Sequence, residues 1–135
     1  MKKLTLLLLM ASLFITSSAS PGIAEVDGKM LLENCQEAVR YMDDKNAAAV
    51  NFSSVNFCVG FISGVNDLHT TFVGSVSCFD PPLFCSPRPA DLEQLVKIVA
   101  VYLKAHPEDL DFNGSVLTVA ALKDAFPCPY STHPD

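Results

Sequence analysis

Residues 55–72 read V-N-F-C-V-G-F-I-S-G-V-N-D-L-H-T-T-F, and this stretch decides the fold. Its apolar side chains recur every three or four positions, as on the buried side of a helix. They are Val55, Cys58, Val59, Phe61, Ile62, Val65, Leu68 and Phe72. Ser53 or Ser54 is expected to cap this helix. Gly60 and Gly64 share one face, and each glycine costs about 1 kcal/mol in a helix interior, so we expect another backbone to approach closely there.

The helical period recurs in three flanking segments. Residues 28–43 carry apolar side chains on one side and charged ones on the other, with Asp27 as the expected N-cap. A second segment begins at Leu92 and is stopped by Pro107, and a third covers residues 115–126. No period-two pattern persists along the chain. The sequence therefore predicts a small all-α domain of four helices, packed as a bundle or as two helical hairpins.

Two connections separate these helices. Residues 44–54 are polar and small and are expected to form a loop. Residues 73–90 contain four prolines, so regular structure is not expected there. Connections of about this length are usually functional or mobile, which makes the second one a candidate binding segment.

The first 24 residues have the pattern of a secretory signal peptide. Met1-Lys2-Lys3 is basic, residues 4–15 are almost entirely apolar, and residues 16–24 are rich in small side chains. The apolar run is too short for a stable membrane anchor, and cleavage after Ala24 fits the small residues best. We therefore expect a leader over residues 1–24 and a single exported domain over residues 25–135, which is soluble and most simply periplasmic.

The charge of the chain limits what it can bind. Nine basic and fifteen acidic residues give a net charge of −6, and removal of the leader takes away two lysines and no acid, which changes it to −8. A protein that neutralises phosphates needs a basic face, so this balance argues against a nucleic-acid partner. It argues equally against attachment to anionic lipid.

Five cysteines in an exported chain of this size predict disulfide bonds. Cys35 and Cys58 lie in the first two predicted helices, and a hairpin can bring them level. Cys85 precedes the third helix and Cys128 follows the fourth, so antiparallel packing places these two together. In that pairing Cys78 has no disulfide partner. The rival pairing joins Cys78 to Cys85 and leaves Cys128 free.

No catalytic or metal-binding pattern accompanies these cysteines. Zinc sites use closely spaced cysteine pairs, which the chain does not contain. His69 and His106 are expected to be surface or capping residues rather than bases for a cysteine nucleophile. We therefore expect no enzyme activity, no cofactor and no metal.

Four pieces of the chain, taken in order, resemble the Rap/Tai family of type VI secretion immunity proteins. These pieces are Leu31-Leu32-x-x-Cys35; Cys58-Val59-Gly60-Phe61-Ile62-Ser63-Gly64-Val65-x-Asp67; Cys85-x-Pro87 with Gln94-Leu95-Val96 and Val101-Tyr102-Leu103; and His106-Pro107-Glu108-x-Leu110 with Ala121-Leu122-x-x-Ala125-Phe126-Pro127-Cys128. The chain departs from the family pattern in three places. Cys78 is extra, Asp111 replaces a usual histidine, and Asn113-Gly114 replaces a usual small residue.

The resemblance implies a small periplasmic all-helical protein that binds and blocks a peptidoglycan amidase effector. Several members of the family are dimers, so a homodimer is compatible with it. Such an inhibitor needs a rigid scaffold and a protruding segment that fills a cleft. We expect this segment in one of two loops that carry acidic and aromatic side chains. The candidate residues are Phe79, Asp80 and Phe84 in one loop, and Glu108, Asp109 and Asp111 in the other.

Two alternatives come from other classes of protein. The first is an exported, disulfide-stabilised helical binding or structural module without a toxin partner. The second is a small periplasmic enzyme or thiol-exchange protein, in which Cys78 would be the reactive residue.

Overall fold

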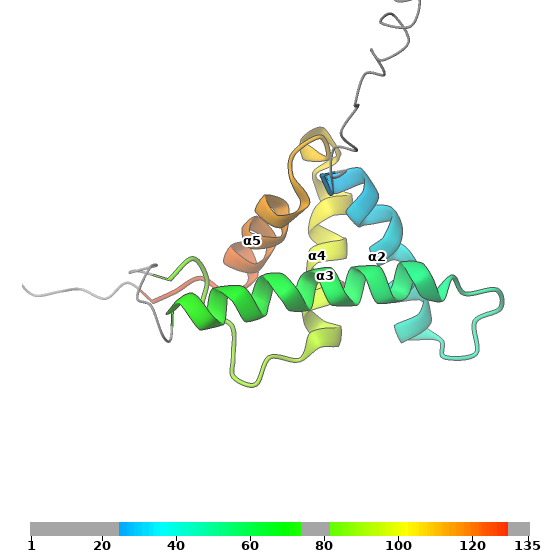
Figure 1. The fold of residues 1–135 in the computed structure, drawn as a ribbon, viewed down its shortest axis with the longest axis horizontal. Coiled ribbons are helices and arrows are strands. Elements are labelled where there is room, and N and C mark those ends of the chain that lie inside the picture. Colours follow the sequence, from blue (N-terminus) through cyan, green and yellow to red (C-terminus); the bar gives the residue numbers. More distant parts are fainter. Residues whose placement is uncertain (1–24, 74–81, 130–135) are drawn as a thin grey trace, which may run out of the picture.

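The computed structural model describes residues 25–73 and 82–129. Four α-helices and one short 3₁₀-helix follow one another along the chain (Figure 1). They are α2 (Gly28–Asp43), α3 (Phe52–Thr71), α4 (Leu92–Ala105), η3 (Pro107–Asp109) and α5 (Gly114–Ala125). The β-structure among the described residues is one isolated bridge, between Asp27 and Asn113. The predicted all-α fold class is confirmed.

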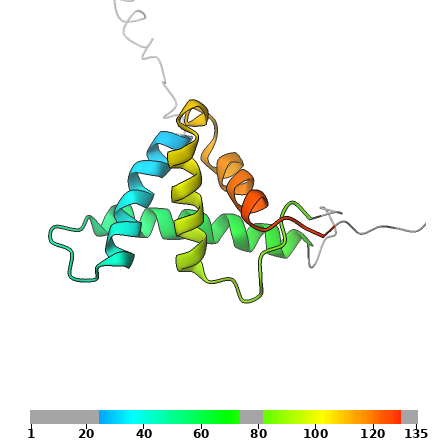
Figure 2. The same cartoon turned by 180° about the vertical axis from the view of Figure 1, so that it is seen from behind.

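The helices form two layers. α2, α4 and α5 lie on one side, with α4 between the other two, and α3 runs across them (Figures 1 and 2). α4 contacts all three of the other long helices. Since α3 crosses the layer instead of lying along one neighbour, its single apolar side meets side chains from α2, α4 and α5.

Short polar side chains start each long helix. Asp27 caps α2 as predicted, and its carboxylate accepts from the N–H of Met30 at 2.8 Å. Asp91 caps α4 in the same way. The predicted cap of α3 is wrong, because Asn51 takes this role and Ser53 lies inside the first turn, where its N–H donates to Asn51.

The core is built from apolar side chains of all four helices. The fully or nearly fully buried members are Leu31, Cys35, Ala38, Val55, Cys58, Ile62, Phe84, Leu95, Val96, Val99, Leu103, Leu117, Ala121 and Leu122. Gly60 and Gly64 are not among them. They are exposed, and a Cβ built on either would meet nothing within 4 Å, so the predicted close backbone approach is wrong.

Two disulfides tie the helices together. Cys35 and Cys58 join α2 to α3, with their Cα atoms 5.1 Å apart, and both residues are fully buried. Cys85 and Cys128 join the segment before α4 to the segment after α5, with their Cα atoms 4.9 Å apart. These are the two pairs that helical hairpins were expected to bring together. Cys78 lies outside the described residues.

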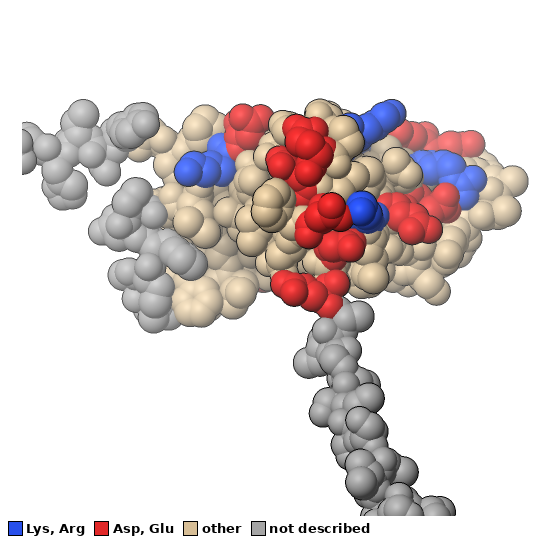
Figure 3. Space-filling view, turned by 90° about the horizontal axis from the view of Figure 1, so that it is seen from above, with Lys and Arg blue, Asp and Glu red and all other residues tan. Residues whose placement is uncertain are grey.

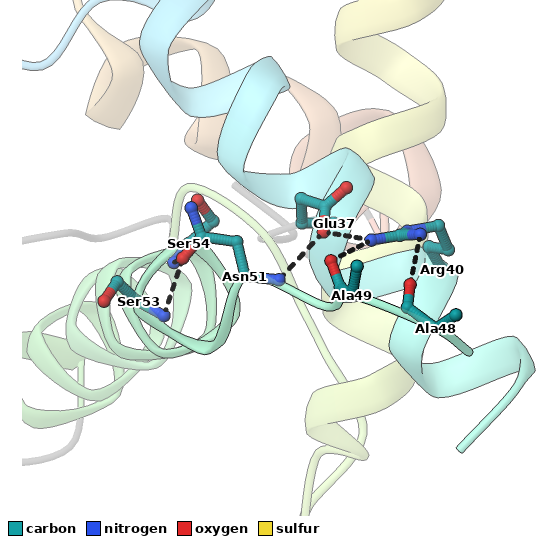
Figure 4. Close-up of polar contacts among 7 residues, drawn as sticks. All are labelled: Glu37, Arg40, Ala48, Ala49, Asn51, Ser53 and Ser54. Atoms are coloured by element: carbon teal, nitrogen blue, oxygen red, sulfur yellow. Dashed lines mark hydrogen bonds and ion pairs between the residues drawn. The ribbon is translucent and has the colours of Figure 1, made fainter. Parts of the chain in front are cut away.

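The connection between α2 and α3 is fastened by one charged pair (Figure 4). The carboxylate of Glu37 accepts from the Arg40 guanidinium at 2.7 Å and from the N–H of Asn51 at 3.2 Å. Arg40 and the Asn51 N–H hold the pKa of Glu37 below its ordinary value. Arg40 also donates to the carbonyls of Ala48 and Ala49, the second of which has a left-handed φ of 54°. Because the Arg40 guanidinium holds both carbonyls, it fixes the end of this loop.

Candidate functional site

The connection between α4 and α5, residues 106–113, forms one end of the molecule. His106 ends α4: its N–H donates to Tyr102 O at 3.1 Å, and its ring stacks on the Tyr102 ring at 4.1 Å. Pro107 then begins η3, since its fixed φ suits a first helical position while its missing N–H prevents α4 from continuing. The chain therefore turns sharply at a fixed point and presents the next residues outwards.

Backbone hydrogen bonds fasten this connection to the start of α2. The N–H groups of Gly28 and Lys29 donate to the carbonyls of Phe112 and Leu110, at 3.0 and 3.2 Å. The packing is close, because a Cβ on Gly28 would lie 2.9 Å from Leu110 Cα and 2.5 Å from a methyl group of Leu117. We call the segment 106–113 the acidic loop. It is held in place by the end of α4, the start of α2 and the start of α5.

Three acids give the loop its charge. Glu108 and Asp111 are exposed, Asp109 is half-buried, and Asp111 forms an ion pair with Lys29 at 2.6 Å. The hydrogen bond that Lys29 donates to the Asp111 carboxylate raises the pKa of Lys29 above its ordinary value. In the space-filling view onto this end, acidic side chains gather over the middle of the face, with fewer basic ones between them (Figure 3). The loop therefore presents a negative, preformed surface.

Phe112 is an aromatic side chain of the acidic loop that sequence reasoning missed. It is 59 % exposed, while its carbonyl and its N–H are both engaged, the first by Gly28 and the second by Asp109 O at 2.9 Å. The sequence contained a signal for it, because it lies directly between Asp111 and the N-cap of the next helix. The predicted contact set listed acids alone at this turn.

Asn113 and Gly114, which replace a usual small residue of the family pattern, have structural roles. The side-chain oxygen of Asn113 caps α5 by accepting from the N–H of Ser115 at 2.8 Å, and its amide donates to Glu25. Gly114 packs against the backbone of Val26 and donates its N–H to the Val26 carbonyl at 2.7 Å. Together these contacts attach the start of α5 to residues 25–26.

The other predicted contact segment is different. Phe79 and Asp80 lie outside the described residues. Phe84 is 1 % exposed and stacks on His69 with ring centroids 3.8 Å apart, so the expectation that it contacts a partner is wrong. His69 is only 7 % exposed, and the expectation of a surface or capping histidine is wrong for it. It belongs to the packing that holds residues 82–90 against α3.

Comparison with known families shows to which family the chain belongs. The sequence profile of the family described as Rap1a immunity proteins matches residues 27–128, which covers all four long helices and both disulfides. The chain belongs to the Rap1a immunity protein family. No curated protein and no solved structure matches it.

An immunity protein must present a binding surface, and this member of the Rap1a family has an apolar groove near the acidic loop. The groove lies between α3, α5 and residue 83 and encloses about 350 Å³. Its lining includes Leu68 and Val116, which are 58 % and 60 % exposed. Val116 lies in the first turn of α5, directly after the acidic loop, so apolar and acidic surfaces adjoin.

Two further findings concern the described part of this Rap1a protein. Within residues 25–73 and 82–129, no three His, Cys, Asp or Glu side chains come together in a way that could hold a metal ion. None of the helices in those ranges combines the length and the hydropathy that crossing a membrane requires.

Proposed function

We propose that this Rap1a protein is exported to the periplasm, where it binds and inhibits a peptidoglycan amidase delivered by type VI secretion. The acidic loop carries the proposal, because it is a preformed, protruding and charged element. The hydrogen bonds of Gly28 and Lys29 to Phe112 and Leu110 fix its backbone before any partner arrives. Little conformational entropy is then lost on binding, and this favours tight association.

Three other observations support export and inhibition. The chain begins with a leader-like segment, residues 1–24. Two disulfides are expected in a protein that works in an oxidising compartment. The net charge of −8 that remains after removal of the leader speeds the capture of a basic partner.

Rescue of cells from a periplasmic amidase tests the proposal. The full chain, co-expressed with type VI peptidoglycan amidases addressed to the periplasm, should restore growth against at least one of them and co-purify with it. A chain without residues 1–24 should not protect, because inhibitor and amidase then lie in different compartments. Protection by the leaderless chain would contradict periplasmic action.

Charge removal from the acidic loop tests the binding surface. The double variant Glu108→Ala/Asp111→Ala should weaken binding to that amidase at least tenfold. Its melting temperature should stay within a degree or two of wild type, because exposed ion pairs such as Lys29–Asp111 contribute little. Asp124→Ala, which removes an exposed acid near the other end of α5, is the control. Unchanged affinity of the double variant would exclude the loop as the inhibitory element.

A further inference from the structure

One large aromatic side chain of the acidic loop is exposed to solvent. Phe112 is 59 % exposed, although its backbone is fixed on both sides by hydrogen bonds to Gly28 and Asp109. Single exposed apolar residues are ordinary on protein surfaces and need no explanation. This one differs because the loop that carries it is fixed and its neighbours are charged.

A fixed aromatic residue among acids has the physical properties of an interface anchor. Aromatic side chains bury a large apolar area while only two torsions become ordered. Residues that dominate binding energy are of this type, and they are surrounded by polar contacts that exclude water. Glu108, Asp109 and Asp111 provide such a polar surround on the same loop.

The charge around Phe112 indicates the chemistry of the surface that receives it. The acidic loop and the adjoining residues 25–29 contain five carboxylates and one lysine, Lys29. A pocket bordered by carboxylates would repel this end of the molecule, whereas a pocket bordered by lysine or arginine would attract it. Val116, four residues further along the chain in the first turn of α5, is a second exposed apolar side chain, 60 % exposed.

We propose that Phe112 is the anchor residue of this immunity protein and enters an apolar pocket bordered by basic side chains on the amidase. The inference rests on the proposed function and adds the residue that determines specificity and the chemistry of its receiving site. Phe112 and the acids then have separable roles. The acids steer the encounter and set the association rate, while Phe112 limits dissociation.

Binding kinetics with the amidase identified by the rescue assay, its catalytic cysteine replaced by alanine, test this division. Phe112→Ala should raise the dissociation rate at least tenfold and leave the association rate, its salt dependence and the melting temperature unchanged. Glu108→Ala/Asp111→Ala should instead lower the association rate and flatten its salt dependence. Phe52→Ala is the matched control, because Phe52 is also an exposed phenylalanine, 56 % exposed, at the start of α3.

The outcomes separate this inference from the function on which it rests. If Phe112→Ala dissociates like wild type while the acidic double variant binds weakly, the anchor is refuted and the proposed function stands. Equal losses for Phe112→Ala and Phe52→Ala would also refute the anchor, since the effect would not depend on position. If no amidase binds the wild-type chain, the proposed function fails and the anchor fails with it.

Discussion

Replacing Gly60 and Gly64 by alanine should stabilise the protein. Both glycines lie inside α3, on its exposed side, and a Cβ at either position would meet nothing within 4 Å. Alanine is favoured over glycine by about 1 kcal/mol in a helix interior, because glycine loses more backbone freedom on folding. Each substitution should therefore raise the free energy of unfolding by about 1 kcal/mol, which corresponds to roughly 4–8 °C in melting temperature for a domain of this size.

Gly28→Ala should have the opposite effect. A Cβ there would lie 2.9 Å from Leu110 Cα, 3.0 Å from the Leu110 carbonyl oxygen and 2.5 Å from a Leu117 methyl group. A side chain can rotate away, but backbone atoms move only if the acidic loop shifts as a whole. Overpacking of this kind costs about 1–3 kcal/mol. The shift also displaces the loop, so Gly28→Ala should weaken binding to the partner.

Thermal unfolding followed by circular dichroism measures both effects on the oxidised protein. The melting temperature should rise for Gly60→Ala and Gly64→Ala and fall for Gly28→Ala. If Gly28→Ala melts like wild type, the close contact between α2 and the acidic loop does not exist in solution. If Gly60→Ala melts lower, and only at high protein concentration, then copies of the chain meet on the outer side of α3.

Two further predictions concern His69 and the disulfides. Burial and the positive charge of a neighbouring arginine lower the pKa of His69 below 6.5, so the unfolded chain protonates first as the pH falls. The free energy of unfolding should therefore decrease below about pH 6.5. Between about pH 7.5 and about pH 5.5, the melting temperature of His69→Phe should fall by less than that of the wild type. Equal falls would contradict this. A mild thiol should reduce Cys85–Cys128 before Cys35–Cys58, because Cys85 is exposed whereas Cys35 and Cys58 are fully buried. Removal of either disulfide should lower the free energy of unfolding by about 3–4 kcal/mol. Alkylation and mass spectrometry of peptides after partial reduction would show the order, and simultaneous loss of both bonds would argue against it.

Local signals were enough to predict the helices. The spacing of apolar residues predicted the range 28–43, and Asp27 was recognised as its cap. The start of α3 was missed because asparagine and serine are comparable N-caps, and Asn51 is followed closely by Ser53. Which of several acceptable caps is used depends on where the preceding loop ends. Here Glu37 holds the N–H of Asn51 and so fixes that point.

Burial across helices could not be predicted in the same way. A phenylalanine in a proline-rich segment is compatible with a surface loop, yet Phe84 stacks on His69 in the interior. Gly60 and Gly64 suggested a close contact, yet α3 turns that side to solvent. Both errors have one cause. The crossing of α3 over the other three helices decides which sides are covered, and the helical period of the sequence does not reveal that crossing.

The sequence drew attention to the acids of the acidic loop but not to Phe112. Glu108, Asp109 and Asp111 were singled out because acids in a turn are visible in a sequence. Phe112 was missed, since its exposure depends on backbone bonds to α2, which lies more than eighty residues earlier in the chain. An aromatic residue beside a helix N-cap packs inward in many proteins. The side chain of Phe112 instead stays outside, 59 % exposed.

The acidic loop and the first residues after the predicted leader form one structural unit. Asn113 donates to Glu25, and Gly114 donates to the Val26 carbonyl at 2.7 Å. Cleavage after Ala24 keeps both acceptors, whereas cleavage two residues later would remove them and release the start of α5. The small residues that suit a signal peptidase therefore end where the contacts of the fold begin. Cleavage at the predicted point would therefore leave a mature chain that keeps Glu25 and Val26, the residues to which the start of α5 is fastened.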